Sequence, residues 1–240
     1  VYGWLYNVNK GSFFTKVIKW VFSGFDRVLT LSEQSRNEWI KIGINPEKVT
    51  TYRYWVNQDL FKPLDKNLSK EKLGYKGKFI VLFAGRLIEA KGVLTLIEAA
   101  KKNKDKTFVF IGEGPLSEKV NEAAKEENII FLSRVKNTDL PPYYNAADVV
   151  VMPSQYEEGY GRVILEALSC GTPVIASNRG GIKEVLTGSV GMLIEPVEEE
   201  ITKALKEISL KELSKNCRPY AEKMFSSDNA LVIEKAYKEV

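Results

Sequence analysis

Two glutamates flank a glycine-containing loop whose residue types could bind an anion. Glu158 precedes Gly159, Tyr160 and Gly161, and Glu166 follows in a segment with helical spacing. A helix that starts after Gly161 presents unpaired N–H groups, which suit a phosphate. Glu166 would lie two turns inside that helix, roughly 8 Å along its axis. The two carboxylates therefore suit two hydroxyl contacts along an extended ligand better than the sharing of one proton.

Cations that could hold a phosphate occur in an earlier loop. Arg86 and Lys91 follow the apolar run 79–84, and Gly85 and Gly92 stand beside them. A doubly wound fold binds phosphate in the loop between its first strand and the next helix. Arginine offers a rigid fork of donors and lysine a mobile point charge, and both glycines would let the backbone approach a ligand. The alternative, that both cations are solvated loop residues, stays open at this point.

The composition excludes several other chemistries. The 240 residues contain no histidine, which rules out Ser–His and Cys–His catalysis and His-ligated zinc within this chain. Because Asp-x-Asp is also absent, we expect no metal site. The two cysteines, Cys170 and Cys217, fit a reducing compartment, and we interpret Cys170 as a small buried hydrophobe. The net charge is +4, and residues 1–78 hold 14 Lys or Arg against 7 Asp or Glu. We interpret this basic first third as a solvated surface and expect no nucleic-acid partner, with contact to nucleic acid or anionic lipid as the alternative.

A regular alternation of apolar runs and helical patterns occupies residues 79–208. Near-continuous apolar strands separated by helices predict a parallel sheet covered on both faces, that is, an α/β, doubly wound, Rossmann-like domain. The expected strands are 79–84, 107–111, 129–132, 149–152, 174–176 and 192–194, and the expected helices are 93–103, 116–126, 138–146, 161–170, 180–187 and 198–208. No run of about 18 apolar residues occurs, so no membrane span is predicted.

The first third of the chain has a different organisation. Residues 12–22 have apolar side chains at helical spacing around Lys16 and Lys19. This predicts a basic amphipathic helix, packed on its own domain or, as the alternative, lying on a membrane surface. Residues 26–31 are expected to form a strand, and Ser32 is expected to be the N-cap of the helix that follows.

The chain is expected to divide near a polar connector. Residues 49–55 are rich in β-formers, and residues 57–78 are polar and contain turn formers. The tail from residue 210 is predicted to be helical, with a break near Pro219. We therefore expect three segments, which are 1–62 as the end of a first domain with its hinge, 63–218 as the Rossmann-like domain, and 219–240 as a C-terminal helix.

The loops together predict a ligand with phosphates in its middle and hydroxyl-bearing rings at both ends. A nucleotide sugar has this form. A dinucleotide has it too, but the fingerprint Gly-x-Gly-x-x-Gly is absent after the strand 79–84. Gly180 and Gly181, which open the helix after the strand 174–176, are further candidates for the cleft.

Seven short motifs, in their order and at their distances, resemble those of glycosyltransferase family 4, which are retaining enzymes of the GT-B fold. The resemblance covers residues 79–195 closely and 26–63 more loosely, as the end of an N-terminal domain and its hinge. It departs from the family at Ser133, where glycine is usual, and at the hinge residues 54–57. The motifs are Gly85-Arg86-Leu87, Lys91-Gly92, Ile111-Gly112-Glu113-Gly114-Pro115, Asp148 to Ser154, Glu158-Gly159-Tyr160-Gly161, Glu166-Ala167 and Gly171-Thr172-Pro173-Val174.

The resemblance implies a role for each candidate site residue. Arg86 and Lys91 would hold the donor diphosphate and stabilise it as the leaving group. Glu158 would contact the donor sugar or the neighbouring phosphate, and Glu166 would bind the ribose hydroxyls. The loop 133–135 would lie beside the nucleobase and recognise it through backbone atoms. The remaining binding residues would be Gly85, Val135, Gly159, Tyr160 and Gly161.

The resemblance also implies an activity. The protein would move a sugar, of the hexose type, from a nucleotide-diphosphate sugar to a sugar or lipid-linked acceptor with retention, and would need no metal or other cofactor. We expect a fragment that is mainly the donor-binding half, incomplete without an N-terminal acceptor domain. It would act in the cytoplasm, at the inner membrane surface if the basic helix binds lipid. The alternatives are a non-catalytic nucleotide-binding module of the same fold and a GT-B nucleotide-sugar epimerase.

Overall fold

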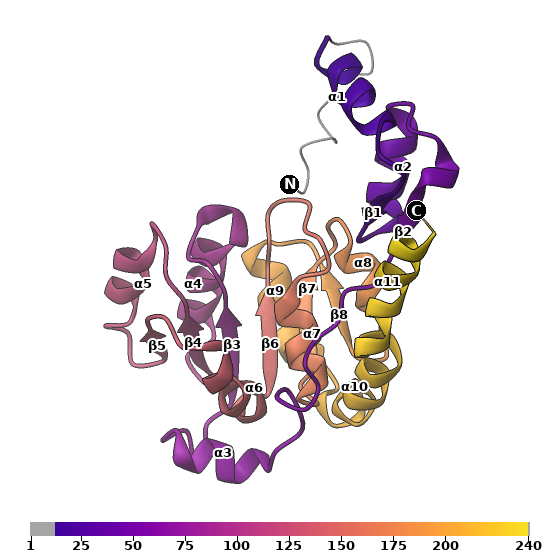
Figure 1. The fold of residues 1–240 in the computed structure, drawn as a ribbon. Helices are drawn as coiled ribbons and strands as arrows, with labels where there is room; N and C mark the ends of the chain where they lie inside the picture. Colours follow the sequence, from indigo (N-terminus) through magenta and orange to yellow (C-terminus); the bar gives the residue numbers. More distant parts are fainter. Residues whose placement is uncertain (1–12, 240) are drawn as a thin grey trace.

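A six-stranded parallel sheet forms the centre of the computed structural model, which describes residues 13–239 (Figure 1). The strand order is β5-β4-β3-β6-β7-β8. The strands are β3 (Ile80–Ala84), β4 (Thr107–Ile111), β5 (Ile129–Leu132), β6 (Val149–Met152), β7 (Val174–Ser177) and β8 (Gly191–Ile194). The predicted doubly wound α/β fold is confirmed, because all six expected strands are present and every pairing is parallel.

Each face of the sheet has its own apolar core, because successive strand residues point to opposite faces. On one face, Val81 and Phe83 of β3 pack with residues of α4 (Val93–Lys102) and α9 (Glu198–Glu207). The helix α5 (Ser117–Ala123) completes this layer through Val120.

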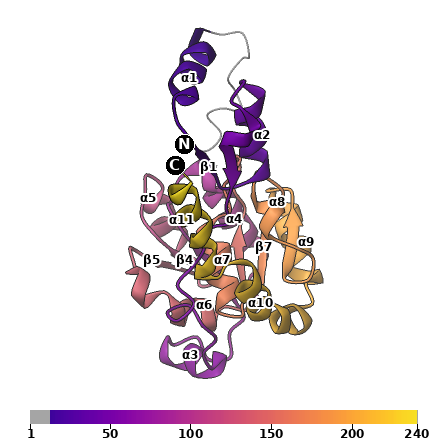
Figure 2. The same cartoon turned by 45° about the vertical axis from the view of Figure 1, so that its right-hand side comes forward.

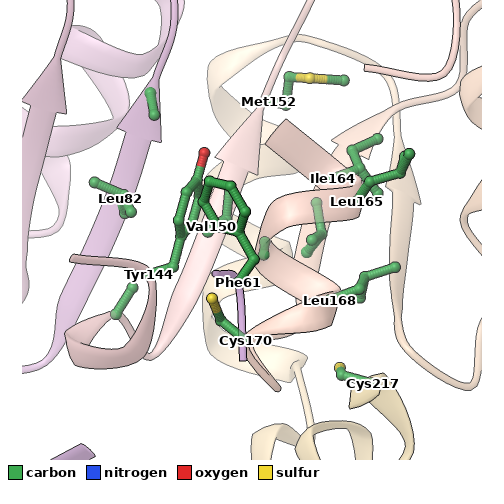
Figure 3. Packing of buried hydrophobic residues seen from close by; sticks show 14 of the residues in the cluster. Phe61, Leu82, Tyr144, Val150, Met152, Ile164, Leu165, Leu168, Cys170 and Cys217 are labelled. Atoms are coloured by element: carbon green, nitrogen blue, oxygen red, sulfur yellow. The ribbon is translucent and has the colours of Figure 1, made fainter. Parts of the chain in front are cut away.

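The opposite face is covered by helices from the second half of the chain. Leu82 and Val150 pack there with α6 (Pro141–Ala146), α7 (Arg162–Ser169) and α10 (Leu210–Met224) (Figure 3). Cys170 and Cys217 belong to the same core and are both free thiols. The prediction that Cys170 is a small buried hydrophobe is therefore confirmed.

The chain reverses its direction across the sheet between β3 and β6. From β3 it proceeds outward to β4 and β5, and it then returns to place β6 beside β3 before it continues to β7 and β8. At such a switch point the loops after the two neighbouring strands diverge and leave a crevice at their carboxyl ends, where open α/β sheets bind ligands. The loops after β3 and β6 carry the predicted site residues, so the fold brings them together.

A small first lobe lies beyond the carboxyl edge of the sheet (Figure 1). Its parallel strands β1 (Val28–Thr30) and β2 (Val49–Thr51) pair with each other, and α2 (Glu33–Lys41) packs beside them. Ser32 accepts a hydrogen bond from the N–H of Ser35, so the predicted N-cap is confirmed. Within the β-rich residues 49–55, the strand β2 covers Val49–Thr51.

The amphipathic helix of the first lobe is α1 (Phe13–Ser23), and Ser12 of the predicted helix lies outside the described residues. Thr15 and Ile18 face the small core of the lobe and are buried. Phe13 and Trp20 remain 82% and 78% exposed. No helix between residues 13 and 239 is both long enough and apolar enough to cross a membrane.

Two connecting segments are more regular than expected, and the predicted break near Pro219 is wrong. The polar connector contains a helix, α3 (Lys66–Lys72), which Asp65 starts by accepting a hydrogen bond from the N–H of Leu68 at 2.7 Å. The tail shows no break near Pro219, since α10 passes through it. Pro219 is exposed, while Cys217 and Ala221 on either side of it are fully buried, so packing holds the helix across the missing hydrogen bond.

The chain returns to the first lobe after α10. A short turn, η4 (Ser227–Ala230), leads into α11 (Leu231–Lys238), which runs toward β1 (Figure 2) and lies near β2 (Figure 1). Arg27 of the first lobe forms a salt bridge of 3.0 Å with Glu239. The boundary expected near residue 218 therefore falls inside a continuous helix.

Candidate functional site

A cavity of about 410 Å³ lies between the two lobes, at the switch point of the sheet. We call it the interlobe cavity. Arg86 and Lys91 from the loop after β3 line it, together with Glu158 from the loop after β6. Leu31 and Tyr54 contribute from the first lobe and the hinge. Of the predicted site residues, Gly85, Gly159, Tyr160 and Gly161 also line this cavity.

A second cavity, of about 500 Å³, adjoins the first. We call it the side cavity. The two share Ala84, Gly85 and Arg86, so they are parts of one cleft. Val135 and Arg134 line the side cavity, as expected for the loop after β5. Its volume lies within the range of about 300–1,000 Å³ that is usual for small-molecule sites.

Lys91 and Glu158, which were assigned to different parts of the ligand, contact each other. Their side chains form a salt bridge inside the interlobe cavity and are 18% and 8% exposed. Ser154 donates a further hydrogen bond of 2.7 Å to the same oxygen, Oε1 of Glu158. The ammonium of Lys91 also lies 5.2 Å from the ring centre of Tyr156. A diphosphate would therefore have to compete with Glu158 for Lys91.

The two glycines beside the cations have different roles. Gly85 lines both cavities, which fits the predicted approach of backbone to ligand. Gly92 does not line either cavity as the described residues form it, so its predicted approach to a ligand stays a prediction. Its φ is +70°, and a Cβ there would lie 1.9 Å from the carbonyl oxygen of Pro153. Gly92 thus closes the turn η2 (Glu89–Lys91), which carries Lys91, against the loop after β6.

Gly180 and Gly181 do not line the interlobe cavity, but they lie against the backbone of Glu158. The N–H of Gly181 donates a 2.8 Å hydrogen bond to the carbonyl of Glu158. Gly180 has a φ of +50°, and a Cβ there would lie 2.2 Å from the same carbonyl oxygen. The pair precedes α8 (Ile182–Val185) and fixes the position of the loop that carries Glu158.

Glu166 lies deeper than the other predicted residues. Its side chain is 5% exposed, and neither cavity, as the described residues form it, includes Glu166 in its lining. The hydroxyl of Tyr144 donates to Oε2 at 2.6 Å, and Oε1 is 3.7 Å from Nη2 of Arg162. Burial raises the pKa of Glu166, and the bond from Tyr144 opposes that rise. The site therefore brings Arg86, Lys91 and Glu158 together and leaves Glu166 behind Arg162.

Arg162 and Ser154 were not among the residues predicted for this site. Arg162 lines the interlobe cavity, and its guanidinium lies 5.9 Å from the ring centre of Tyr54. It precedes Glu166 by one helical turn, and this i,i+4 spacing was the available signal. Ser154 is completely buried beside Glu158, and no pattern in the sequence distinguishes it from a packing residue.

Several known proteins are similar to this chain in sequence. Residues 65–224 match the family described as Glycosyl transferases group 1. D-inositol 3-phosphate glycosyltransferase 2 of Catenulispora acidiphila is 30% identical over 194 residues, which cover 72% of this chain and 45% of that protein. Spore coat protein SA of Bacillus subtilis is 32% identical over 182 residues, which cover 70% of this chain and 47% of that protein. The chain spans about half the length of these relatives.

Known structures share its fold. HepE of Anabaena, crystallised with UDP and glucose, has a TM-score of 0.82 at 24% identity, over 94% of this chain and 67% of that one. Sucrose-phosphate synthase of Thermosynechococcus elongatus has a TM-score of 0.83 at 25% identity, over 100% of this chain and 64% of that one. The fold is that of the GT-B, Rossmann-like glycosyltransferases. Since the family match covers most of the chain, the protein belongs to the family Glycosyl transferases group 1.

Proposed function

We propose that this chain is the donor-binding half of a retaining glycosyltransferase of family 4 that uses a nucleotide-diphosphate sugar. One observation carries the proposal. Arg86 and Lys91 share the interlobe cavity with Glu158 and with the start of α7, at the switch point of the sheet. The crystal structure of HepE with UDP and glucose, a protein of the same fold, supports this class of ligand.

The chemistry that these residues would perform is stabilisation of the leaving group. The bond between the anomeric carbon and the diphosphate oxygen breaks, and a bond to the acceptor oxygen forms on the same face of the sugar. The acceptor proton moves to the departing phosphate. Arg86 and Lys91 would offset the negative charge that develops, and preorganised charges of this kind commonly make the largest protein contribution to catalysis. This step requires no metal or other cofactor.

The remaining contacts follow from the two adjoining cavities. Gly85, Gly159, Tyr160 and Gly161 would bind the phosphates and the sugar in the interlobe cavity, with Glu158 on a sugar hydroxyl. Val135 would place its backbone beside the nucleobase in the side cavity. Glu166 would bind the ribose hydroxyls after the guanidinium of Arg162 moves away from its carboxylate.

The acceptor would approach from the side of the first lobe. Leu31 and Tyr54 line the interlobe cavity there, and a preceding acceptor domain would extend this wall. A sugar or lipid-linked acceptor fits a cytoplasmic enzyme whose α1 rests on the inner membrane surface. The exposure of Phe13 and Trp20 on α1, beside Lys16 and Lys19, supports this placement.

Calorimetric titration of the 240-residue chain with UDP, GDP and ADP tests the phosphate site. We expect micromolar to millimolar affinity for one of them. The Arg86→Ala, Lys91→Ala double variant is expected to bind at least about tenfold more weakly, because hydrogen bonds to charged groups are each worth about 1.5–3 kcal/mol.

The control is Lys119→Ala, Lys125→Ala, which removes two exposed lysines near α5 and leaves both cavities intact. It should bind the nucleotide as the unaltered chain does. Unchanged affinity in the Arg86, Lys91 variant would refute the assigned phosphate site. An assay of the full-length protein for sugar transfer, with the anomeric configuration of the product determined, distinguishes a retaining transferase from a binding module or an epimerase.

A further inference from the structure

Tyr144 is a buried tyrosine whose hydroxyl faces the cleft end of the core. Its ring is completely buried and packs edge-on against Phe61, with ring centres 5.9 Å apart. The hydroxyl points toward the carboxyl ends of the strands (Figure 3). There it donates a hydrogen bond of 2.6 Å to Oε2 of Glu166, which comes from a different helix. Tyr144 lies on α6 and Glu166 on α7, so this hydrogen bond joins two helices.

The two oxygens of Glu166 have unequal partners. Oε2 has the short bond from Tyr144, whereas Oε1 has longer contacts with the residues that the structure describes, 3.4 Å to Nδ2 of Asn137 and 3.7 Å to Nη2 of Arg162. Arg162 lines the interlobe cavity, and Val135 and Leu140, on either side of Asn137 in the chain, line the side cavity. Oε1 therefore faces Arg162, which lines the interlobe cavity, and Oε2 faces the buried Tyr144.

We propose that Tyr144 is a positioning residue for ribose recognition, which holds Oε2 of Glu166 so that Oε1 is presented to a ligand hydroxyl. This rests on the proposed function, in which Glu166 binds the ribose. The terminal torsion of a glutamate is soft, so a buried carboxylate keeps one orientation only if a partner fixes it. Burial and the neighbouring Glu166 raise the pKa of Tyr144 well above its ordinary value, so its hydroxyl remains a donor at any working pH.

The hydroxyl of Tyr144 can be removed without removing its ring. Tyr144→Phe keeps the contact with Phe61 and leaves Oε2 of Glu166 without its short bond. A second variant, Glu166→Asp, keeps the charge but withdraws the carboxylate from Tyr144 by one methylene. Tyr220→Phe is the matched control, because Tyr220 donates a comparable bond of 3.0 Å to the carbonyl of Val185, outside the lining of both cavities.

The experiment measures the preference for ribose over deoxyribose. Each variant of the chain is titrated with UDP, or with GDP or ADP if one of these binds more tightly, and with the 2′-deoxy and 3′-deoxy forms. We expect the unaltered chain to prefer the ribonucleotide by about tenfold, the effect of one hydrogen bond to a charged group. Tyr144→Phe and Glu166→Asp should each lower this preference at least about threefold. Their affinity for the deoxy forms should stay the same, and Tyr220→Phe should keep the full preference.

The outcomes separate this inference from the function on which it rests. If Glu166→Gln abolishes the preference while Tyr144→Phe and Glu166→Asp retain it, Tyr144 has no positioning role and the ribose assignment stands. Equal weakening of ribose and deoxyribose forms in Tyr144→Phe would indicate a purely structural role and would also overturn the inference. If the unaltered chain binds a nucleotide but shows no preference, the ribose assignment of Glu166 fails and the inference fails with it. If it binds none of the three nucleotides, the proposed function itself fails.

Discussion

Lys91 and Glu158 neutralise each other inside the interlobe cavity, and this changes how variants of Lys91 should be interpreted. Both side chains are mostly buried, so removal of either one leaves a mostly buried charge without its partner. A loss of binding in a Lys91 variant therefore combines a lost ligand contact with a disturbed loop. Arg86 is exposed, and its substitution tests the phosphate site more directly.

A double-mutant cycle on this pair has a definite expected result. Lys91→Met should lower the free energy of unfolding by about 2–4 kcal/mol, because it strands the buried Glu158. Glu158→Gln introduced into Lys91→Met should recover about half of that loss or more, because it removes the stranded charge. Urea unfolding of the four proteins measures both quantities, with the exposed Lys119→Met as a control near zero. Simple additivity of the two single changes would contradict the coupling.

The candidate site was partly predictable at the level of single residues. Arg86, Lys91 and Glu158 stand next to glycines at the ends of apolar runs, and this pattern locates them at the crevice of a doubly wound sheet. The partner of Glu166 was not predictable. Tyr144 belongs to another helix and has the spacing of a core residue, and only the folded chain shows that its hydroxyl meets a carboxylate.

At the level of elements, a side chain of the second lobe caps a helix of the first. Glu184 of α8 accepts hydrogen bonds from the N–H groups of Glu33 and Gln34, at 3.1 and 3.2 Å. These N–H groups lie in the first turn of α2, where the helix dipole also favours a negative charge. Because Gly181 ties the start of α8 to Glu158, the cap connects the loop of the site to the first lobe.

Loss of this cap should have a measurable cost. Glu184→Ala is expected to lower the free energy of unfolding by about 0.5–2 kcal/mol, the usual range for a lost helix N-cap. Glu184→Gln should lose less, because its amide oxygen can still accept one of the two bonds. The neighbour Lys183 is exposed, and Lys183→Ala serves as the control. Equal midpoints of thermal unfolding for Glu184→Ala and Lys183→Ala would show that the cap contributes nothing.

The elements themselves were mostly predictable, because apolar runs of strand length and helical spacing are local signals. The predictions of elements were incorrect where the local sequence pattern is weak, or where contacts with distant residues determine the structure instead. The helix α3 is short and polar, and only Asp65 indicated its start. The helix α10 passes Pro219 because Cys217 and Ala221 pack in the core, and Arg218 beside it donates hydrogen bonds to the carbonyls of Phe61 and Ser169, at 2.9 and 3.1 Å. Such long-range contacts leave no trace in a local pattern.

On the scale of the whole molecule, the C-terminal segment is part of the main core. Phe225, which follows α10, is completely buried and packs against Tyr220 with ring centres 5.8 Å apart. Its carbonyl accepts a hydrogen bond from the N–H of Val56 in the hinge. The hinge therefore depends on the end of the chain as much as on its neighbours in sequence. This contact was not predictable from the sequence, because the two segments lie far apart along the chain.

Phe225→Ala should accordingly be among the more costly substitutions. We expect a loss of about 3–5 kcal/mol in the free energy of unfolding, because a large buried ring is replaced by a methyl group. Leu231→Ala, at a side chain that is 58% exposed, should change it by no more than about 0.5 kcal/mol. Guanidinium unfolding measures both. A small effect of Phe225→Ala would mean that the hinge does not rely on the C-terminal segment.

The return of α11 to the first lobe also makes the chain suitable for a spectroscopic measurement. Glu239 binds Arg27, and Asn229 donates a hydrogen bond to the carbonyl of Tyr54, so α11 is attached to the first lobe and to the hinge. Tyr237 on this helix is 79% exposed and can be replaced by a labelled cysteine. Energy transfer from a dye at position 237 to a second dye on α5 would then report rotation of the lobes, without any change to a residue of the cleft.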